Sequence, residues 1–165
     1  MKTLYLVTHG EKETGADPDM TVAGKTCVRS LRIHLVIDPP LVCIGEALRH
    51  FAVAEELGYS DTGVRLQISS VFGACGSLEL IDGEKMLVLA SGIKVAFETC
   101  TSGEDAGPSL RAKLKKLPNE TVICAGREVL LALGIPLSEA KSGSVYAIKV
   151  DGDEIKIEFI ATGTN

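Results

Sequence analysis

The chain contains a short apolar run that leads directly into a histidine and a glycine. The run is Leu4-Tyr5-Leu6-Val7, and Thr8-His9-Gly10-Glu11 follows it without a break. An apolar, β-favouring run that ends in turn residues predicts a buried strand of an α/β sheet. In open sheets of this kind ligands bind at the carboxyl ends of the strands, and glycine allows a sharp turn or the close approach of a ligand. His9 is therefore predicted to lie at a binding edge.

Strand and helix patterns alternate along the rest of the chain. A first helix is expected from Thr21, whose side chain can cap it, to Leu35. Further helices are expected over 46–57, 109–117 and 127–133. Strands are expected over 41–44, 64–68 and 121–124. Segments 145–150 and 155–160 alternate around Asp151-Gly152-Asp153, which predicts a hairpin. The apolar segments 86–90 and 95–97 do not distinguish strand from helix. The pattern predicts a single α/β domain over residues 1–165, a three-layer sandwich with a mostly parallel central sheet flanked by helices and an antiparallel C-terminal hairpin.

Composition limits the function classes. The chain has 165 residues, enough for a proper core, and a formal net charge of −5. A mildly acidic chain argues against nucleic acid as a partner, because nucleic-acid binders usually present a basic face. Any site for an anion must be locally positive. No apolar run is long enough to span a membrane and no signal peptide is visible, so the expected location is the cytoplasm.

Neither the cysteines nor the histidines show metal-ligand spacing. The five cysteines are scattered without a Cys-x-x-Cys pair, which is typical of reduced, buried thiols in a cytosolic protein. Cys124 ends a strand near the expected binding edge, where core packing and a reactive thiol are both open. His9, His34 and His50 have no spacing of the His-x-x-x-His kind. We expect no metal and no cofactor.

Three further segments give the chain a family resemblance. They are Asp19–Cys27 and Gly45–Ala54, which open helices, and Thr121–Leu130, a strand that runs into a helix. In this order, and with Thr8–Glu11, the chain resembles the histidine phosphatase superfamily, the phosphoglycerate-mutase-like proteins. Members carry Arg-His-Gly-Glu after the first strand, then Leu-Thr-x-x-Gly, Ser-x-x-x-Arg and a strand ending in Ser-His-Gly. The resemblance implies the three-layer fold that the pattern also predicts.

The chain departs from these motifs at several positions. Thr8 stands where the family has its first phosphate-binding arginine, and Gly45 replaces the serine four residues before Arg49. In the last motif Ala125 falls on the serine and Gly126 on the second histidine. Of the residues at the family's phosphate pocket, His9 and Arg49 remain.

The resemblance implies a role for each of the remaining site residues. His9 would attack phosphorus and carry the phosphoryl group, and Arg49 would hold a phosphoryl oxygen. Gly10 would permit close approach of the phosphate. Thr8 offers a single hydroxyl donor in place of a permanently charged fork. Gly126 marks the position of the lost histidine.

Other charged and titratable residues are open to two interpretations. Arg127 follows Gly126 at a helix start and can replace part of the lost positive charge, or it can be an ordinary exposed arginine. His50 is interpreted as a half-buried helix residue. Glu79 and Glu84 lie in the region where the family's proton donor is expected, and the local pattern selects neither.

Three hypotheses follow. The first is a degenerate member of the superfamily, a pseudoenzyme that keeps the fold, binds a phosphate or another anion, and turns over poorly or not at all; its partner would be phosphate or a phosphorylated small molecule or protein. The second is an active phosphomonoesterase or phosphohistidine phosphatase that uses His9, Arg49 and Arg127. The third is a scaffold that contacts another protein.

Overall fold

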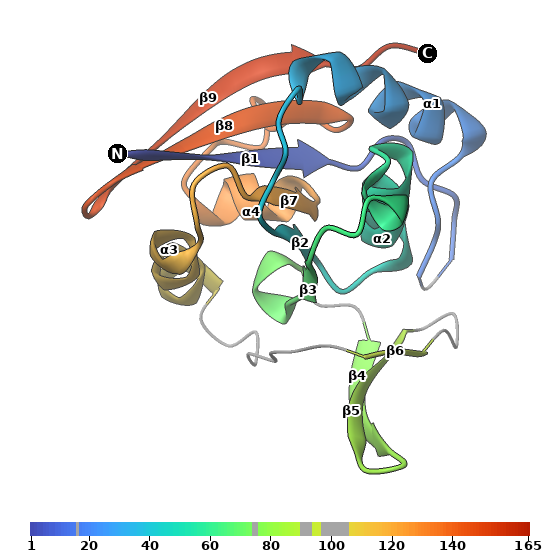
Figure 1. Cartoon of the computed structure of the whole chain (residues 1–165). Coiled ribbons are helices and arrows are strands. Elements are labelled where there is room, and N and C mark those ends of the chain that lie inside the picture. Colours follow the sequence, from blue (N-terminus) through green and yellow to red (C-terminus); the bar gives the residue numbers. More distant parts are fainter. Residues whose placement is uncertain (16, 74–75, 90–93, 97–105) are drawn as a thin grey trace.

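A computed structural model describes residues 1–15, 17–73, 76–89, 94–96 and 106–165. Its centre is a six-stranded sheet in the order β3-β2-β7-β1-β8-β9 (Figure 1). The strands are β1 (Lys2–Thr8), β2 (Val42–Ile44), β3 (Leu66–Ile68), β7 (Val122–Ala125), β8 (Ser144–Asp151) and β9 (Glu154–Thr162). Strands β3, β2, β7 and β1 are parallel neighbours, whereas β8 pairs antiparallel with both β1 and β9. The predicted parallel sheet and C-terminal hairpin are confirmed.

Helices cover both faces of this sheet. They are α1 (Val22–Ser30), α2 (Leu48–Glu56), α3 (Ala106–Lys116) and α4 (Arg127–Ala132), with short 3-10 turns η1 (Leu31–His34), η2 (Tyr59–Asp61) and η3 (Ser70–Phe72). Side chains alternate across a strand, so Leu4 and Leu6 of β1 pack in one cluster with α3 and α4, while Val7 packs in the other with α1 and α2. The molecule therefore has the predicted three layers.

The central strands are apolar because both their faces are buried. Val122, Ile123 and Cys124 of β7 are fully inaccessible to solvent, and β7 lies between β1 and β2. The outer strand β9 instead alternates between half-buried and exposed residues. This is the difference expected between a strand enclosed by helices on both sides and an edge strand of the hairpin.

A second, three-stranded antiparallel sheet follows η3 in the chain. It contains β4 (Gly76–Ile81), β5 (Glu84–Leu89) and β6 (Lys94–Ala96) and stands away from the six-stranded sheet in Figure 1. Strands β4 and β5 are joined at Asp82-Gly83, where both residues have positive φ, 52° and 81°. Asp-Gly in this conformation is a favoured two-residue hairpin turn. The ambiguous segments 86–90 and 95–97 thus belong to strands over their described residues.

Most predicted helices agree with the structure to within a few residues. The first one is shorter than expected, because α1 ends at Ser30 and the chain continues as the 3-10 turn η1. As expected, the side chain of Thr21 caps α1 by accepting from the backbone N–H of Gly24 at 3.0 Å. Across the described ranges, no helix combines the length and the apolar character needed to cross a membrane.

Candidate functional site

The carboxyl ends of three neighbouring strands meet at one edge of the sheet. The backbone N–H of His9, just after β1, donates to Ala125 O at 3.0 Å. That of Gly45, just after β2, donates to Cys124 O at 3.0 Å. These bonds extend the sheet ladders by one residue, so His9, Gly45 and Gly126 leave the sheet side by side. The edge is the predicted one.

Hydrogen bonds orient the imidazole of His9. Its Nδ1 lies 2.9 Å from Gly10 O, and its Nε2 lies 3.2 Å from Nε of Arg49. A carbonyl oxygen only accepts and a guanidinium only donates. We therefore assign the proton to Nδ1, which leaves the lone pair on Nε2. A ring in this tautomer presents Nε2 as a base or nucleophile.

A cavity of about 200 Å³ lies against this ring. Its polar lining consists of His9, Lys12, Arg49, Arg127 and Glu128, and Leu131 and Leu137 complete it. We call it the His9 cavity. Burial, together with the positive charges of Arg49, Lys12 and Arg127, lowers the pKa of His9 to about 4, although the hydrogen bond to Gly10 O acts in the opposite direction. The cavity is thus locally positive although the whole chain is acidic, as an anion site in this chain requires.

Arg49 is held in place by a buried aspartate. The carboxylate of Asp17 accepts from the backbone N–H of Leu48 at 3.0 Å, and Nη1 of Arg49 lies 3.9 Å from the same oxygen, Oδ1. Helix α2 has no capping side chain of its own at Ala47, so Asp17 also serves its first turn. The aspartate comes from the β1–α1 loop and gave no signal in the sequence.

Thr8 does not face the His9 cavity. Its side chain is fully buried, and its hydroxyl donates to Lys141 O at 2.8 Å and accepts from Ser144 N at 3.0 Å. The structure places it at the junction of β1 and β8. The Thr8 hydroxyl, which was predicted to donate to phosphate, is used in these two hydrogen bonds instead.

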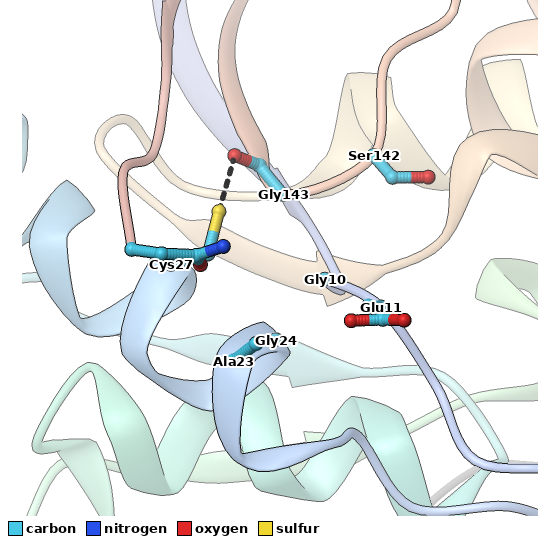
Figure 2. A pocket seen from close by; sticks show the side chains of 8 residues that line it. Gly10, Glu11, Ala23, Gly24, Cys27, Ser142 and Gly143 are labelled. Carbon is cyan, nitrogen blue, oxygen red and sulfur yellow. Dashed lines mark hydrogen bonds between the residues drawn. The ribbon is translucent and has the colours of Figure 1, made fainter.

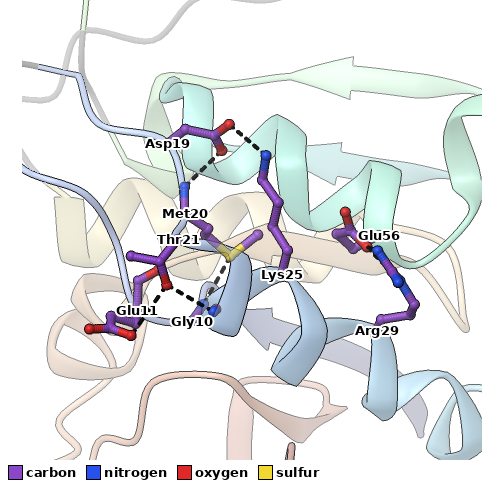
Figure 3. Close-up of polar contacts among 9 residues, drawn as sticks. Gly10, Glu11, Asp19, Met20, Thr21, Lys25, Arg29 and Glu56 are labelled. Atoms are coloured by element: carbon purple, nitrogen blue, oxygen red, sulfur yellow. Dashed lines mark hydrogen bonds and ion pairs between the residues drawn. The ribbon is translucent and has the colours of Figure 1, made fainter. Parts of the chain in front are cut away.

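Gly10 also lies beside the cavity rather than in it. A Cβ on Gly10 would stand 2.6 Å from Gly24 O, so the glycine permits contact between the β1–α1 loop and α1. Its backbone N–H donates to the sulfur of Met20 at 3.1 Å (Figure 3). On its other side is a second, smaller depression, where Cys27 Sγ lies 3.6 Å from Gly143 O (Figure 2).

Ion pairs and a cap hold this loop and α1 together (Figure 3). The hydroxyl of Thr21 lies 3.2 Å from Glu11 Oε2, and Lys25 pairs with Asp19 at 2.8 Å. Arg29 joins α1 to Glu56 of α2 at 2.7 Å. The segment that carries His9 and Lys12 is thus braced against both helices of its face.

Gly126 and Arg127 come from the turn between β7 and α4. Gly126 has extended backbone, with φ −122°, so a side chain there meets no backbone strain. Arg127 is exposed, as an ordinary surface arginine would be, and it also lines the His9 cavity. Lys12, which was not predicted at the site, adds a third cation there.

His50 and Glu128 also lie at the site, although neither was predicted there. His50, interpreted from sequence as half-buried, is only 1 % exposed, and its ring centroid lies 5.8 Å from that of His9. Its Nε2 is 3.6 Å from Oε1 of Glu128. Burial, with the charges of Arg49 and His9, holds the pKa of His50 well below its ordinary value, so the ring is neutral.

The remaining candidates lie elsewhere. Glu79 is on β4 and Glu84 on β5, and neither lines the His9 cavity. Cys124 is fully buried, and burial raises its pKa strongly, so it packs in the core as an unreactive thiol. Cys43 is buried too, Cys27 is half-buried, and Cys75 and Cys100 lie outside the described residues.

Comparison by structure gives clear matches where comparison by sequence gives none. No family model matches the chain, and no curated protein matches it. Among solved structures, a candidate alpha-ribazole-5'-P phosphatase from Escherichia coli aligns with a TM-score of 0.65 at 16% identity, over 98% of each chain. The alpha-ribazole phosphatase from Shigella flexneri aligns at 0.62 and 15%, over 98% of this chain and 96% of its own. A mycobacterial glucosyl-3-phosphoglycerate phosphatase aligns at 0.60 and 14%, over 99% of both.

The chain has the histidine phosphatase fold. The near-complete coverage of both partners means that the architecture is shared from end to end.

Proposed function

We propose that the chain is a divergent member of the histidine phosphatase superfamily that binds the phosphoryl group of a phosphomonoester at the His9 cavity and turns it over slowly. One observation carries the proposal: the Nε2 lone pair of His9 lies beside Arg49, in a cavity that Lys12 and Arg127 also line. A neutral imidazole among cations suits attack on the phosphorus of an anion, and the cations favour both the bound phosphate and the charge that develops.

Slow turnover follows from the absence of two phosphate-binding side chains that the family motif carries. The hydroxyl of Thr8 is engaged at the β1–β8 junction, and Gly126 has no side chain to offer. Loss of one well-placed donor to developing charge costs about 3–4 kcal/mol in a comparable enzyme. Lys12 and Arg127 supply charge in compensation, but from exposed positions where water competes with them.

The partner expected is a phosphorylated small molecule or a phosphorylated side chain of a protein. Leu131 and Leu137 line the same cavity as the cations and are 43% and 61% exposed. An organic group attached to the phosphate would cover part of this apolar surface, which favours a carbon-rich phosphomonoester over free phosphate.

The second candidate is an efficient phosphatase. The assigned tautomer of His9 favours it, because a ring with Nδ1 already donating to Gly10 O needs no change of tautomer before attack; only the Arg49 N–H has to turn from Nε2 to the phosphoryl group. The structural neighbours are also named as phosphatases. The two candidates differ in rate, so one experiment addresses both.

The test measures phosphate binding by calorimetry and hydrolysis of p-nitrophenyl phosphate by the same preparations. We expect Arg127→Ala to weaken phosphate binding about tenfold, the loss of one charge-assisted hydrogen bond. Lys156→Ala removes a lysine that pairs with Glu154 outside the cavity and should change nothing. His9→Asn should abolish hydrolysis while most phosphate binding remains.

Three results would contradict the proposal. If the protein does not bind phosphate, or if the Arg127→Ala and Lys156→Ala proteins bind it equally well, the His9 cavity is not the phosphate site. If the His9→Asn protein still hydrolyses the substrate, His9 is not the nucleophile. A turnover number in the usual enzyme range of about 1–1000 per second would favour the second candidate.

A further inference from the structure

Three glycines surround the two unpredicted side chains at the site. A Cβ built on Gly45 would collide with Nδ1 of His50, and one on Gly126 would collide with Oε2 of Glu128. A Cβ on Gly73 would stand 2.9 Å from Cε1 of His50 and 2.8 Å from Oε1 of Glu128. The His50 ring and the Glu128 carboxylate thus occupy space beside all three positions; Phe72 O also stands 2.5 Å from a Cβ on Gly45, and the φ of +128° at Gly73 itself favours glycine.

The fit explains two departures from the family motifs together. Gly45 stands on the family's serine and Gly126 on its second histidine. In this chain the first space holds His50 and the second holds the Glu128 carboxylate. A carboxyl group has therefore entered the strand end at which the motif carries an imidazole.

His50 and Glu128 form a pair that reaches from the interior into the cavity. Among the described residues, no side chain gives either ring nitrogen of the buried His50 a well-formed hydrogen bond; the backbone of Gly45 interacts with the ring, and Oε1 of Glu128 is 3.6 Å from Nε2. The side chain of Glu128 is 47% exposed and lines the His9 cavity. A shift of a few tenths of an ångström would give His50 a hydrogen bond and hold the carboxyl in one place.

We propose that Glu128 is the proton donor to the leaving group during phosphoryl transfer to His9, and that His50 positions it. This rests on the proposed function. As Nε2 of His9 bonds to phosphorus, the bond from phosphorus to the leaving oxygen breaks and its electron pair stays on that oxygen. The proton of the Glu128 carboxyl moves to the same oxygen, which releases an alcohol and leaves a carboxylate.

The second half of the cycle restores both groups. The Glu128 carboxylate takes a proton from water as the water oxygen bonds to phosphorus. The bond from phosphorus to Nε2 breaks, and its electron pair returns to the ring. Inorganic phosphate leaves, and Glu128 is again protonated.

Glu128 suits this role better than the other carboxylates nearby. Among the described residues that line the His9 cavity it is the acidic one. Asp17 is buried against Arg49 and the start of α2, where it accepts hydrogen bonds. A general acid must stand within reach of the reacting oxygen, and Glu128 is on the wall of the cavity that holds His9.

The test compares two phosphoryl donors in single-turnover labelling of His9. A nitrophenolate leaves without a proton, whereas the alkoxide of glycerol phosphate needs one. Glu128→Gln should slow labelling from glycerol phosphate about 100-fold or more, the usual size of general-acid catalysis, and labelling from p-nitrophenyl phosphate less than about tenfold. Glu139→Gln makes the same change at an exposed site and should alter neither rate.

The His50→Asn variant tests whether His50 positions Glu128, again by comparing the labelling rates from the two phosphoryl donors. Labelling from glycerol phosphate should fall more than labelling from p-nitrophenyl phosphate, while calorimetric phosphate affinity stays within about twofold. A general loss of packing would instead reduce both rates together. If His50→Asn does not fold, the Glu128→Gln ratio decides the donor role alone.

The outcomes separate the two proposals. Equal losses with both donors in Glu128→Gln would overturn the donor role while His9 labelling still supports the proposed function. If wild-type protein takes no label from either donor, the proposed function fails and the donor role fails with it.

Discussion

The imidazole of His9 is kept uncharged by its surroundings. It is half-buried, and Arg49, Lys12 and Arg127 oppose a further positive charge beside them. The hydrogen bond to Gly10 O favours the charged ring but does not outweigh burial. The folded protein therefore holds a neutral His9 at any pH above about 4.

This environment has a cost in stability at low pH. The folded-state pKa of His9 is about 4 against 6.5 for the ordinary side chain, so between these values the unfolded chain binds a proton that the folded chain does not. The contribution of His9 to stability therefore falls as pH falls from 6.5 to 4. The shift corresponds to at most about 3 kcal/mol.

We expect His9→Asn to remove this part of the acid sensitivity. Urea unfolding at pH 7 and pH 4 should show a smaller loss of unfolding free energy in the variant than in the wild type. His34→Asn, at an exposed histidine of η1, should behave as the wild type does. The same loss in all three proteins would mean that His9 titrates normally in the folded state.

At the scale of elements, the contact between the β1–α1 loop and α1 depends on two glycines. A Cβ on Gly24 would collide with the backbone oxygen of Glu11, and Gly10 packs against the same helical turn. The clash is with backbone on both sides, so no rotamer change can relieve it. The helix would have to move away from the loop that carries His9.

Gly24→Ala should therefore destabilise the protein, although alanine favours a helix by about 1 kcal/mol over glycine. Overpacking of this kind costs about 1–3 kcal/mol, and the displaced loop should also weaken phosphate binding. Val22→Ala is the matched control, because Val22 is 83% exposed on the same helix and should be neutral or slightly stabilising. Thermal melting and calorimetry measure both effects. A Gly24→Ala protein with unchanged melting temperature would show that this contact is not tight.

The elements that sequence predicts well are those with a local signature. Apolar runs bounded by turn residues mark β1, β2 and β7, and Thr21 marks the start of α1. The β4–β5 hairpin also has such a signature in Asp82-Gly83, although the hairpin was not among the predicted elements.

The site is harder to predict because its parts come from different elements. His9 and Arg49 were found through a motif. Lys12, His50 and Glu128 depend on which way a side chain points once the strand ends meet, and this is a property of packing between elements. The available signal was the pair of glycines at 45 and 126, because glycines at strand ends can mark places where another group approaches the backbone closely.

At the scale of the whole molecule, Thr8 joins the parallel part of the sheet to the antiparallel hairpin. Its buried hydroxyl holds Lys141 O and Ser144 N at the point where the chain enters β8. The backbone adds a bond from Gly143 N to His9 O at 2.8 Å. A position that carries a phosphate-binding arginine in the family motif thus carries a structural hydrogen bond in this chain.

We expect Thr8→Val to lower stability without changing phosphate binding. Valine has nearly the same shape but leaves the N–H of the buried Ser144 without its acceptor, which costs about 1–3 kcal/mol of unfolding free energy. Thr8→Ser keeps the hydroxyl and should lose less. Urea unfolding measures the first effect, and calorimetry with phosphate the second. The opposite result would be a Thr8→Val protein that keeps its stability but binds phosphate more weakly. It would mean that Thr8 contacts the anion directly, because only a direct contact with the ligand would produce that pair of results.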